Sequence, residues 1–229
     1  MVSLLERPYV NRRQAGQRLS ESLAAYQDQH PLILGIPRGG VVVADTIART
    51  LDTDLDIVLT RKLGAPGNPE LAIGAVSENG RVIMQAEIAA KVGADEDYVE
   101  REKQRQLEEI RARRERYRGV LAKALLQGRT VILVDDGIAT GATMQASIWA
   151  AREEQPREVI VAVPVAPGDA VKRLEGEADR VVCPYIPPYF YAIGQFYVDF
   201  EQVGDQEVME ILQAHSARKE EVGGRIYDC

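Results

Sequence analysis

Five short apolar runs rich in β-branched residues are spread along the chain, and stretches with helical periodicity separate most of them. The runs are LILGI at 32–36, DIVLT at 56–60, TVILVD at 130–135, EVIVAVPV at 158–165 and RVVCPYI at 180–186. The helical stretches lie at roughly 11–27, 41–51, 140–154 and 168–177. This alternation predicts βαβ units, and therefore an α/β fold whose parallel sheet is covered by helices on both faces. Ligands bind such sheets at the carboxyl ends of the strands.

Size and composition favour one globular domain that spans residues 1–229. The apolar fraction of 45% and the charged fraction of 28% are ordinary for a soluble protein, and no apolar run approaches the roughly 20 residues that span a bilayer. The N-terminus has no apolar stretch followed by a small-residue cleavage site, so we expect a cytoplasmic protein without membrane partners. The net charge of −7 argues against a surface that coats nucleic acid.

Cysteine and histidine offer little for catalysis in this chain. Cys183 and Cys229 can form neither a disulfide framework nor a cysteine zinc site. His30 and His215 lie far apart in the sequence. We therefore expect both histidines on the surface.

The connection between the second and third apolar runs is long for a compact domain. Residues 61–84 are rich in glycine and proline, and the pieces LAIGAV and RVIM flank a turn-like SENG, which predicts a mobile loop plus a small hairpin. A helix is expected from about 95 to 127, with Asp95 as its cap and Gly128 as its stop. Its charges balance, so we expect a solvated helix rather than an RNA-binding arm, and a homodimer contact along it is compatible with the pattern.

Seven aromatic residues fall within residues 184–200, after the last apolar run. Adjacent prolines and the lack of a helical period favour a hood over the sheet rather than a core helix. Asp205 can then cap a closing helix, in which Val208, Ile211 and Leu212 share one face.

The run VILVDDGIATGAT at 131–143 carries the clearest chemical signal. Four apolar residues predict a buried strand, Asp135 and Asp136 emerge at its carboxyl end, and glycines and small residues let backbone amides converge before a helix starts near Thr143. A phosphate there would meet free N–H groups and the positive end of a helix dipole. The two carboxylates can accept hydrogen bonds from ribose hydroxyls or hold water around Mg²⁺. The run therefore predicts a site for a phosphorylated ribose, and the chain has no P-loop or dinucleotide-binding fingerprint that competes with it.

This run resembles the signature of the type I phosphoribosyltransferases, in which an apolar strand, two acids and a short spacer precede Thr-Gly-x-Thr. The resemblance implies a parallel-sheet, Rossmann-like core at about 28–183, a flap and helix insertion at 61–127, and a small hood from the N-terminal segment and 184–229. It also implies that the residues of the run bind phosphoribosyl pyrophosphate (PRPP). The PRPP-binding residues would be Asp135, Asp136, Ala139, Thr140, Gly141, Ala142 and Thr143.

Two further elements agree with the resemblance. GIPRGGVVVA at 35–44 looks like the family's pyrophosphate loop, in which members often hold a strained or cis peptide and glycines admit the leaving diphosphate. Arg38, Gly39 and Gly40 would belong to that site. Arg61 and Lys62 open the glycine-rich segment, where related enzymes place basic groups and a flap that closes over the pyrophosphate. The segment RKLGAPGNPELAIGAV at 61–76 also resembles sequences of a bacterial group of predicted phosphoribosyltransferases. This second resemblance does not identify the acceptor.

The aromatic segment resembles the base-binding segment of hypoxanthine-guanine phosphoribosyltransferases. Alignment on Gly194 puts Tyr191 in the position that stacks on the base, next to Phe190. Asp199 then falls one residue beyond the position of an aspartate that helps to hold Mg²⁺ in that family. An aromatic cluster that packs as core is the competing interpretation.

The function implied is transfer of a phosphoribosyl group from PRPP, carried with Mg²⁺, to a nitrogenous base or small amine, with release of pyrophosphate. Asp135, Asp136, Arg38 and Lys62 are the candidate catalytic residues. The alternative is a regulator of the same fold that senses PRPP or nucleotides without turnover, which would need a basic face to bind nucleic acid. A methyltransferase or dehydrogenase lacks support because its glycine fingerprint is absent.

Overall fold

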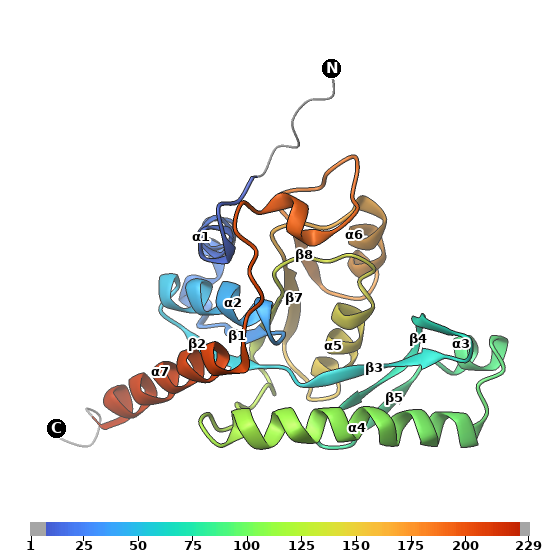
Figure 1. The fold of residues 1–229 in the computed structure, drawn as a ribbon. Coiled ribbons are helices and arrows are strands. Elements are labelled where there is room, and N and C mark those ends of the chain that lie inside the picture. The colour runs from blue at the N-terminus through green and yellow to red at the C-terminus, as the bar shows by residue number, and fades with distance from the viewer. Residues whose placement is uncertain (1–7, 225–229) are drawn as a thin grey trace.

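The computed structural model describes residues 8–224, and within them a five-stranded parallel sheet forms the centre (Figure 1). The strand order is β2-β1-β6-β7-β8, and every neighbouring pair is parallel. The strands are β1 (Leu32–Gly35), β2 (Asp54–Ile57), β6 (Thr130–Val134), β7 (Glu158–Ala162) and β8 (Arg180–Val182). Each of the five apolar runs supplies one strand, so the α/β prediction is confirmed. The run at 56–60 is shifted, because β2 ends at Ile57 and Thr60 begins a strand of a second sheet.

Helices cover both faces of this sheet, and the strand side chains alternate between them. Ile33, Ile132 and Ile160 point into a core with α1 (Arg12–Leu23), α2 (Gly39–Thr50) and α7 (Asp205–Gly224), whereas the neighbouring strand residues pack against α5 (Ala142–Arg152) and α6 (Gly168–Glu175). A 3₁₀ helix, Ala24–Gln29, follows α1. Within residues 8–224, no helix combines the length and the apolar character needed to cross a membrane.

The insertion forms a second, antiparallel sheet of three strands, β3 (Thr60–Ala65), β4 (Asn68–Ser77) and β5 (Val82–Met84), followed by α3 (Ala86–Lys91). The hairpin of β4 and β5 is confirmed. Residues 61–65 were expected in a mobile loop, and that expectation is wrong. Together with Thr60 they pair with β4, with irregular register at Gly64 and Ala65, so Gly64 lies in a bulged strand rather than a free loop.

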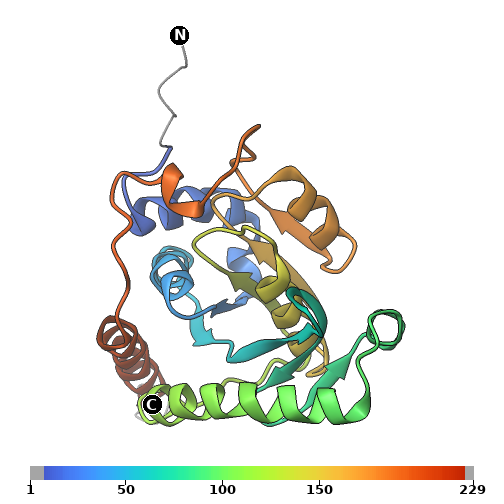
Figure 2. The ribbon, with the colours of Figure 1, turned by 45° about the vertical axis from the view of Figure 1, so that its right-hand side comes forward.

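Helix α4 (Glu96–Arg118) runs along this second sheet (Figures 1 and 2). Asp95 caps it as predicted, because its carboxylate accepts from the backbone N–H of Tyr98 at 2.7 Å. The predicted end near residue 127 is wrong, since the helix ends at Arg118. Beyond it, Asp56 accepts from the backbone N–H of Ala124 at 2.8 Å, which holds the following segment against β2 in a non-helical path.

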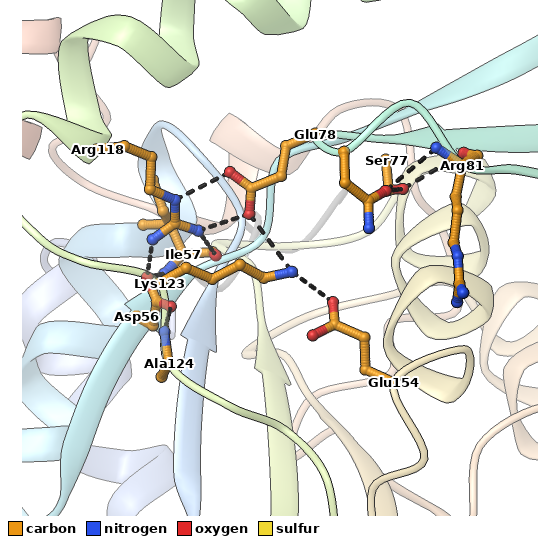
Figure 3. Close-up of polar contacts among 10 residues, drawn as sticks. Asp56, Ile57, Ser77, Glu78, Arg81, Arg118, Lys123, Ala124 and Glu154 are labelled. Carbon is orange, nitrogen blue, oxygen red and sulfur yellow. Dashed lines mark hydrogen bonds and ion pairs between the residues drawn. The ribbon is translucent and has the colours of Figure 1, made fainter.

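An ion-pair network joins the insertion to the parallel sheet (Figure 3). Arg118, at the end of α4, binds Asp56 of β2 at 2.5 Å and Glu78 of the β4–β5 turn at 2.9 Å. Lys123 extends the network to Glu154 at 2.6 Å. Asp56 is 1% exposed, so the pair that it forms with Arg118 lies inside the protein, whereas Lys123 and Glu154 are partly exposed.

The aromatic segment after β8 packs partly as core, in agreement with the competing interpretation for part of it. Phe196, in the 3₁₀ helix Ile193–Phe196, and Tyr197 are buried with Tyr9 and Val165. Backbone hydrogen bonds between Tyr9 and this segment bring the N-terminal part of the chain beside it. The first seven residues, part of the expected hood, lie outside the described residues.

Helix α7 begins at Asp205 and buries Val208, Ile211 and Leu212 as predicted. The surface position expected for His215 is wrong, because it is only 4% exposed and its Nε2 lies 2.8 Å from Oδ1 of Asp45. The same helical face that buries the apolar residues reaches His215 one turn later, where α2 supplies a carboxylate as partner. His30 is exposed as expected, whereas Cys183 is half-buried after β8 and Cys229 lies outside the described part of the chain.

Candidate active site

Two loops meet at the carboxyl ends of β1 and β6, which are parallel neighbours. The backbone N–H of Ile36 donates to the carbonyl of Val134 at 2.9 Å, so the chain after β1 is held beside the acidic pair. A Cβ on Gly40 would lie 2.7 Å from that carbonyl oxygen, and one on Gly39 would lie 1.9 Å from Oδ2 of Asp136. Only glycine fits this approach. The structure thus brings together the two segments that the sequence singled out.

The two acids of the pair have different surroundings. Asp136 is 9% exposed, and its carboxylate accepts from Nε of Arg12 at 2.7 Å. Its backbone carbonyl accepts from the hydroxyl of Tyr197 at 2.6 Å. Asp135 accepts from the backbone N–H of Asp136 at 2.9 Å, and burial together with the charge of Asp136 raises the pKa of Asp135 well above its usual range. Asp135 is therefore the acid that gains most from an approaching cation or hydroxyl donor.

Arg12 and Tyr197 are site residues that the sequence did not reveal. The guanidinium of Arg12 also lies 3.8 Å from the centre of the Phe200 ring and donates to the carbonyl of Glu201 at 2.8 Å. Burial, then the charge of Asp136, raises the pKa of Tyr197, so its hydroxyl stays a donor. Both residues reach the acidic pair across long sequence separations, and no local motif marks such contacts.

The residues after the acidic pair form a turn that leads into α5, where the sequence predicts a site for an anion. Gly141 has a φ of +79°, a left-handed conformation that favours glycine, and α5 begins at the next residue. Ala139, Thr140 and Thr143 are exposed. The first backbone N–H groups of α5 have no carbonyl partner within the helix, and they form the positive end of its dipole. Arg173 of α6 donates to the carbonyl of Thr140 at 2.9 Å and adds a positive charge nearby.

A cavity of about 250 Å³ is lined by Ile36 and Pro37 of the glycine loop, Thr143 of α5, the start of β3 and one face of α4. The peptide bond between Pro37 and Arg38 is cis, as the resemblance implied for this loop. Arg38 immediately precedes α2 and is not among the described residues that line the cavity.

The predicted cations Arg61 and Lys62 line this cavity, where each is paired with a carboxylate. Arg61 donates to Oε1 of Gln106 at 2.9 Å and binds Glu109, both on α4. Lys62 lies 3.0 Å from Oε2 of Glu70. The helix expected to be solvated therefore provides one wall of the cavity, which the helical spacing of its inward-facing residues could have indicated.

The residues predicted to bind a base are less closely grouped. Tyr191 is 84% exposed, and Phe190 is half-buried with its ring centre 5.3 Å from that of Phe196. Asp199 accepts from the backbone N–H of Glu201 at 3.3 Å and lines a separate cavity of about 210 Å³ with Arg12 and Arg13. The structure therefore does not bring Asp199 to the cavity beside the glycine loop.

Comparisons with known proteins agree on one family. The model of the phosphoribosyl transferase domain matches residues 10–201. Two Mycobacterium tuberculosis proteins named provisionally as phosphoribosyl transferases are 41% identical over 208 residues, which is 90% of this chain and 47% of theirs. The chain thus spans about half the length of these curated relatives.

The crystal structure of the Thermus thermophilus protein TT1426 is similar throughout, with a TM-score of 0.86 and 50% sequence identity over 90% of this chain and 98% of that one. The family match covers both loops of the site and the two sheets. The matched residues include the acidic pair, the turn that follows it and the glycine loop, which lie at neighbouring strand ends. The chain belongs to the phosphoribosyl transferase domain family.

Proposed function

We propose that this protein transfers the 5-phosphoribosyl group of PRPP to a nitrogenous base or small amine and releases pyrophosphate. The observation that carries the proposal is the direct contact between the acidic-pair loop and the glycine loop, next to a cavity lined by cations. A substrate with a phosphate at one end, a diol in the middle and a diphosphate at the other end matches these three parts in order.

In this proposal the backbone amides from Ala139 to Thr143 hold the 5′-phosphate, and Asp135 accepts hydrogen bonds from the ribose hydroxyls. Arg38, Arg61 and Lys62 stabilise the departing diphosphate. The bond from the anomeric carbon to the diphosphate oxygen breaks, the bond to the acceptor nitrogen forms, and the acceptor loses a proton. Positioning and charge stabilisation carry such a displacement, so no protein nucleophile is required.

Asp136 has a different role in this scheme from the one first expected. Its carboxylate is held by Arg12, and Tyr197 holds its backbone carbonyl, so it fixes the glycine loop and the hood relative to Asp135. We therefore assign the ribose contact mainly to Asp135 and treat Asp136 as a residue that positions the loops.

Magnesium fits the site as a partner of the substrate. Among the side chains that the structure describes, in residues 8–218, no cluster of three or more His, Cys, Asp or Glu is placed to hold a metal ion. Asp135, which has no ion-pair partner of its own among the described contacts, would hold the ion through water, and the bound ion would supply positive charge to the diphosphate. The exposed ring of Tyr191, with Phe190 beside it, is the surface we propose for the acceptor base.

The test uses Asp135→Asn, with the exposed Asp169→Asn at the start of α6 as the matched control. Because the pKa of Asp135 is already raised, the neutral amide should fold normally. We expect wild type and the control to release pyrophosphate from PRPP and Mg²⁺ with one member of a panel of bases and amines, and PRPP to raise their Tm. Asp135→Asn should lose both effects. Retention of the PRPP-dependent Tm shift in Asp135→Asn would contradict the assignment, and tight PRPP binding without turnover would favour the regulator.

A further inference from the structure

One face of α4 forms a wall of the cavity beside the glycine loop. The lining residues from this helix recur at helical spacing, and they are Glu102, Arg105, Gln106, Glu109, Ile110 and Arg113. This helix belongs to the insertion between β2 and β6, outside the parallel sheet and its two loops. Contacts with other side chains account for Glu102, Arg105, Gln106 and Glu109 on this face, which leaves Arg113 to be explained.

Arg113 differs from the other cations that line the cavity. Arg61 is paired with Glu109, Lys62 with Glu70, and Arg105 with Glu102 at 2.7 Å. Arg113 has no carboxylate partner among the side chains described for residues 8–218, although it is half-buried. Its neighbours Arg111 and Arg114 are exposed. A guanidinium that is partly removed from water without a counter-charge costs free energy, and an anion in the cavity would offset that cost.

The ion-pair network in Figure 3 anchors the end of α4, the helix that also carries Arg113. Arg118, little more than one turn later, binds Asp56 at 2.5 Å and donates to the carbonyl of Ile57 at 3.1 Å. The chain that follows Ile57, from Val58 to Lys62, lines the same cavity. The network thus holds the helix that carries Arg113 and the strand that carries Arg61 in a fixed relation.

We propose that Arg113 is a diphosphate-binding residue, supplied to the site by the inserted helix. The inference rests on the proposed function, since it names the protein group that receives the leaving diphosphate. A guanidinium binds a phosphate group through two parallel N–H donors, which an ammonium cannot reproduce. Arg61 is paired with Glu109 and Lys62 with Glu70, so Arg113 is the cation of this cavity that a diphosphate can bind without displacing a described carboxylate.

The test is calorimetric titration of wild type, Arg113→Gln, Arg113→Lys and Arg111→Gln with magnesium pyrophosphate and, separately, with ribose 5-phosphate. Arg111 lies on the exposed side of the same helix and is the matched control. We expect Arg113→Gln to weaken pyrophosphate binding about tenfold or more and to leave ribose 5-phosphate binding within twofold, because the phosphate turn is untouched. Arg113→Lys should fall between wild type and Arg113→Gln, and Arg111→Gln should match wild type for both ligands.

The outcomes separate the inference from the proposed function. If Arg113→Gln binds pyrophosphate as wild type does, or loses both ligands together, the role of Arg113 is wrong while the PRPP site stands. Wild-type binding of ribose 5-phosphate without pyrophosphate would also overturn the role of Arg113. If wild type binds neither ligand, the proposed function fails and the inference fails with it.

Discussion

At the scale of single residues, the site depends on two glycines that let one loop lie on another. A Cβ at Gly39 would collide with the carboxylate of Asp136, and one at Gly40 would collide with the backbone of Val134 and Asp135. The carboxylate of Asp136 is at the same time bound by Arg12. An extra methyl group at Gly39 therefore acts on the glycine loop, the acidic pair and the first helix together.

We predict that Gly39→Ala weakens PRPP binding by about tenfold or more and destabilises the fold by about 1–3 kcal/mol, the usual cost of overpacking. The new Cβ would lie 1.9 Å from Oδ2 of Asp136 and 2.9 Å from Nε of Arg12, so their contact has to open or the loop has to move. Thermal unfolding with and without PRPP measures both effects. Gly168→Ala is the control, since its Cβ would meet only Ile186 at 3.6 Å. An unchanged PRPP affinity in Gly39→Ala would contradict the prediction.

Sequence patterns singled out the candidate site residues whose neighbours lie close by in the chain. Asp135, the turn to Thr143 and the loop at Gly39 and Gly40 each follow a strand, and parallel strands place their carboxyl ends at one edge. Arg12, Tyr197 and Arg113 were not singled out, because each reaches the candidate site through tertiary packing. The burial of His215 was missed for the same reason, since its partner Asp45 lies on another helix.

At the scale of secondary-structure elements, the strand runs and most helices were predicted within a few residues, and the errors fall in the insertion. Glycine and proline in residues 61–67 suggested a loop, but β4 provides a hydrogen-bonding partner that overrides local preference. The end of α4 was placed too late because Arg118 binds Asp56 and Glu78, which the helical pattern does not reveal. Tertiary contacts thus decided both boundaries.

We predict that Arg118→Met destabilises the protein by about 3–5 kcal/mol near pH 7, because it leaves a buried carboxylate without its partner. Burial already raises the pKa of Asp56 despite Arg118, while Glu78 and Asp56 together outweigh burial and raise the pKa of Arg118. The two pKa shifts are consistent, because the single guanidinium of Arg118 is shared by two carboxylates. Without it the pKa of Asp56 should rise further.

Asp56 has a higher pKa in the folded state than in the unfolded state, where the pKa is 3.8. Such a carboxyl contributes its full stability at a pH below the unfolded-state pKa, and that contribution is lost as the pH rises through the folded-state pKa. The deficit of Arg118→Met relative to wild type should therefore shrink as pH falls toward about 4. Urea unfolding across this range measures it. Lys123→Met, in the same network but 34% exposed, should cost less than about 1 kcal/mol. A deficit that grows on acidification would show that Asp56 is not its source.

At the scale of the whole molecule, α7 connects the parts that build the site. Asp205 at its start accepts from the hydroxyl of Tyr117 at 2.5 Å and binds Arg116, so the helix is tied to α4. His215, further along, is bound to Asp45 of α2, the helix that follows the glycine loop. The closing helix therefore ties the wall of the cavity to the loop beside it. The stability of an Asp45 variant therefore tests the contact between α2 and α7.

We predict that Asp45→Asn destabilises the protein by about 1–3 kcal/mol near pH 7, the range for hydrogen bonds to a charged group. Burial opposes the charge of Asp45, but hydrogen bonds from His215 and Arg49 outweigh it and lower its pKa below 3.8. A lowered pKa contributes stability above the unfolded value and loses it as pH falls through the folded value. Wild type should therefore lose more stability below about pH 4 than Asp45→Asn does, as urea unfolding at a series of pH values would show.

The control is Asp52→Asn, which neutralises an exposed partner of Arg218 on α7. It should change neither the stability near pH 7 nor its pH dependence by much. Parallel pH profiles for wild type and Asp45→Asn would mean that the buried contact between α2 and α7 does not depend on the charge of Asp45.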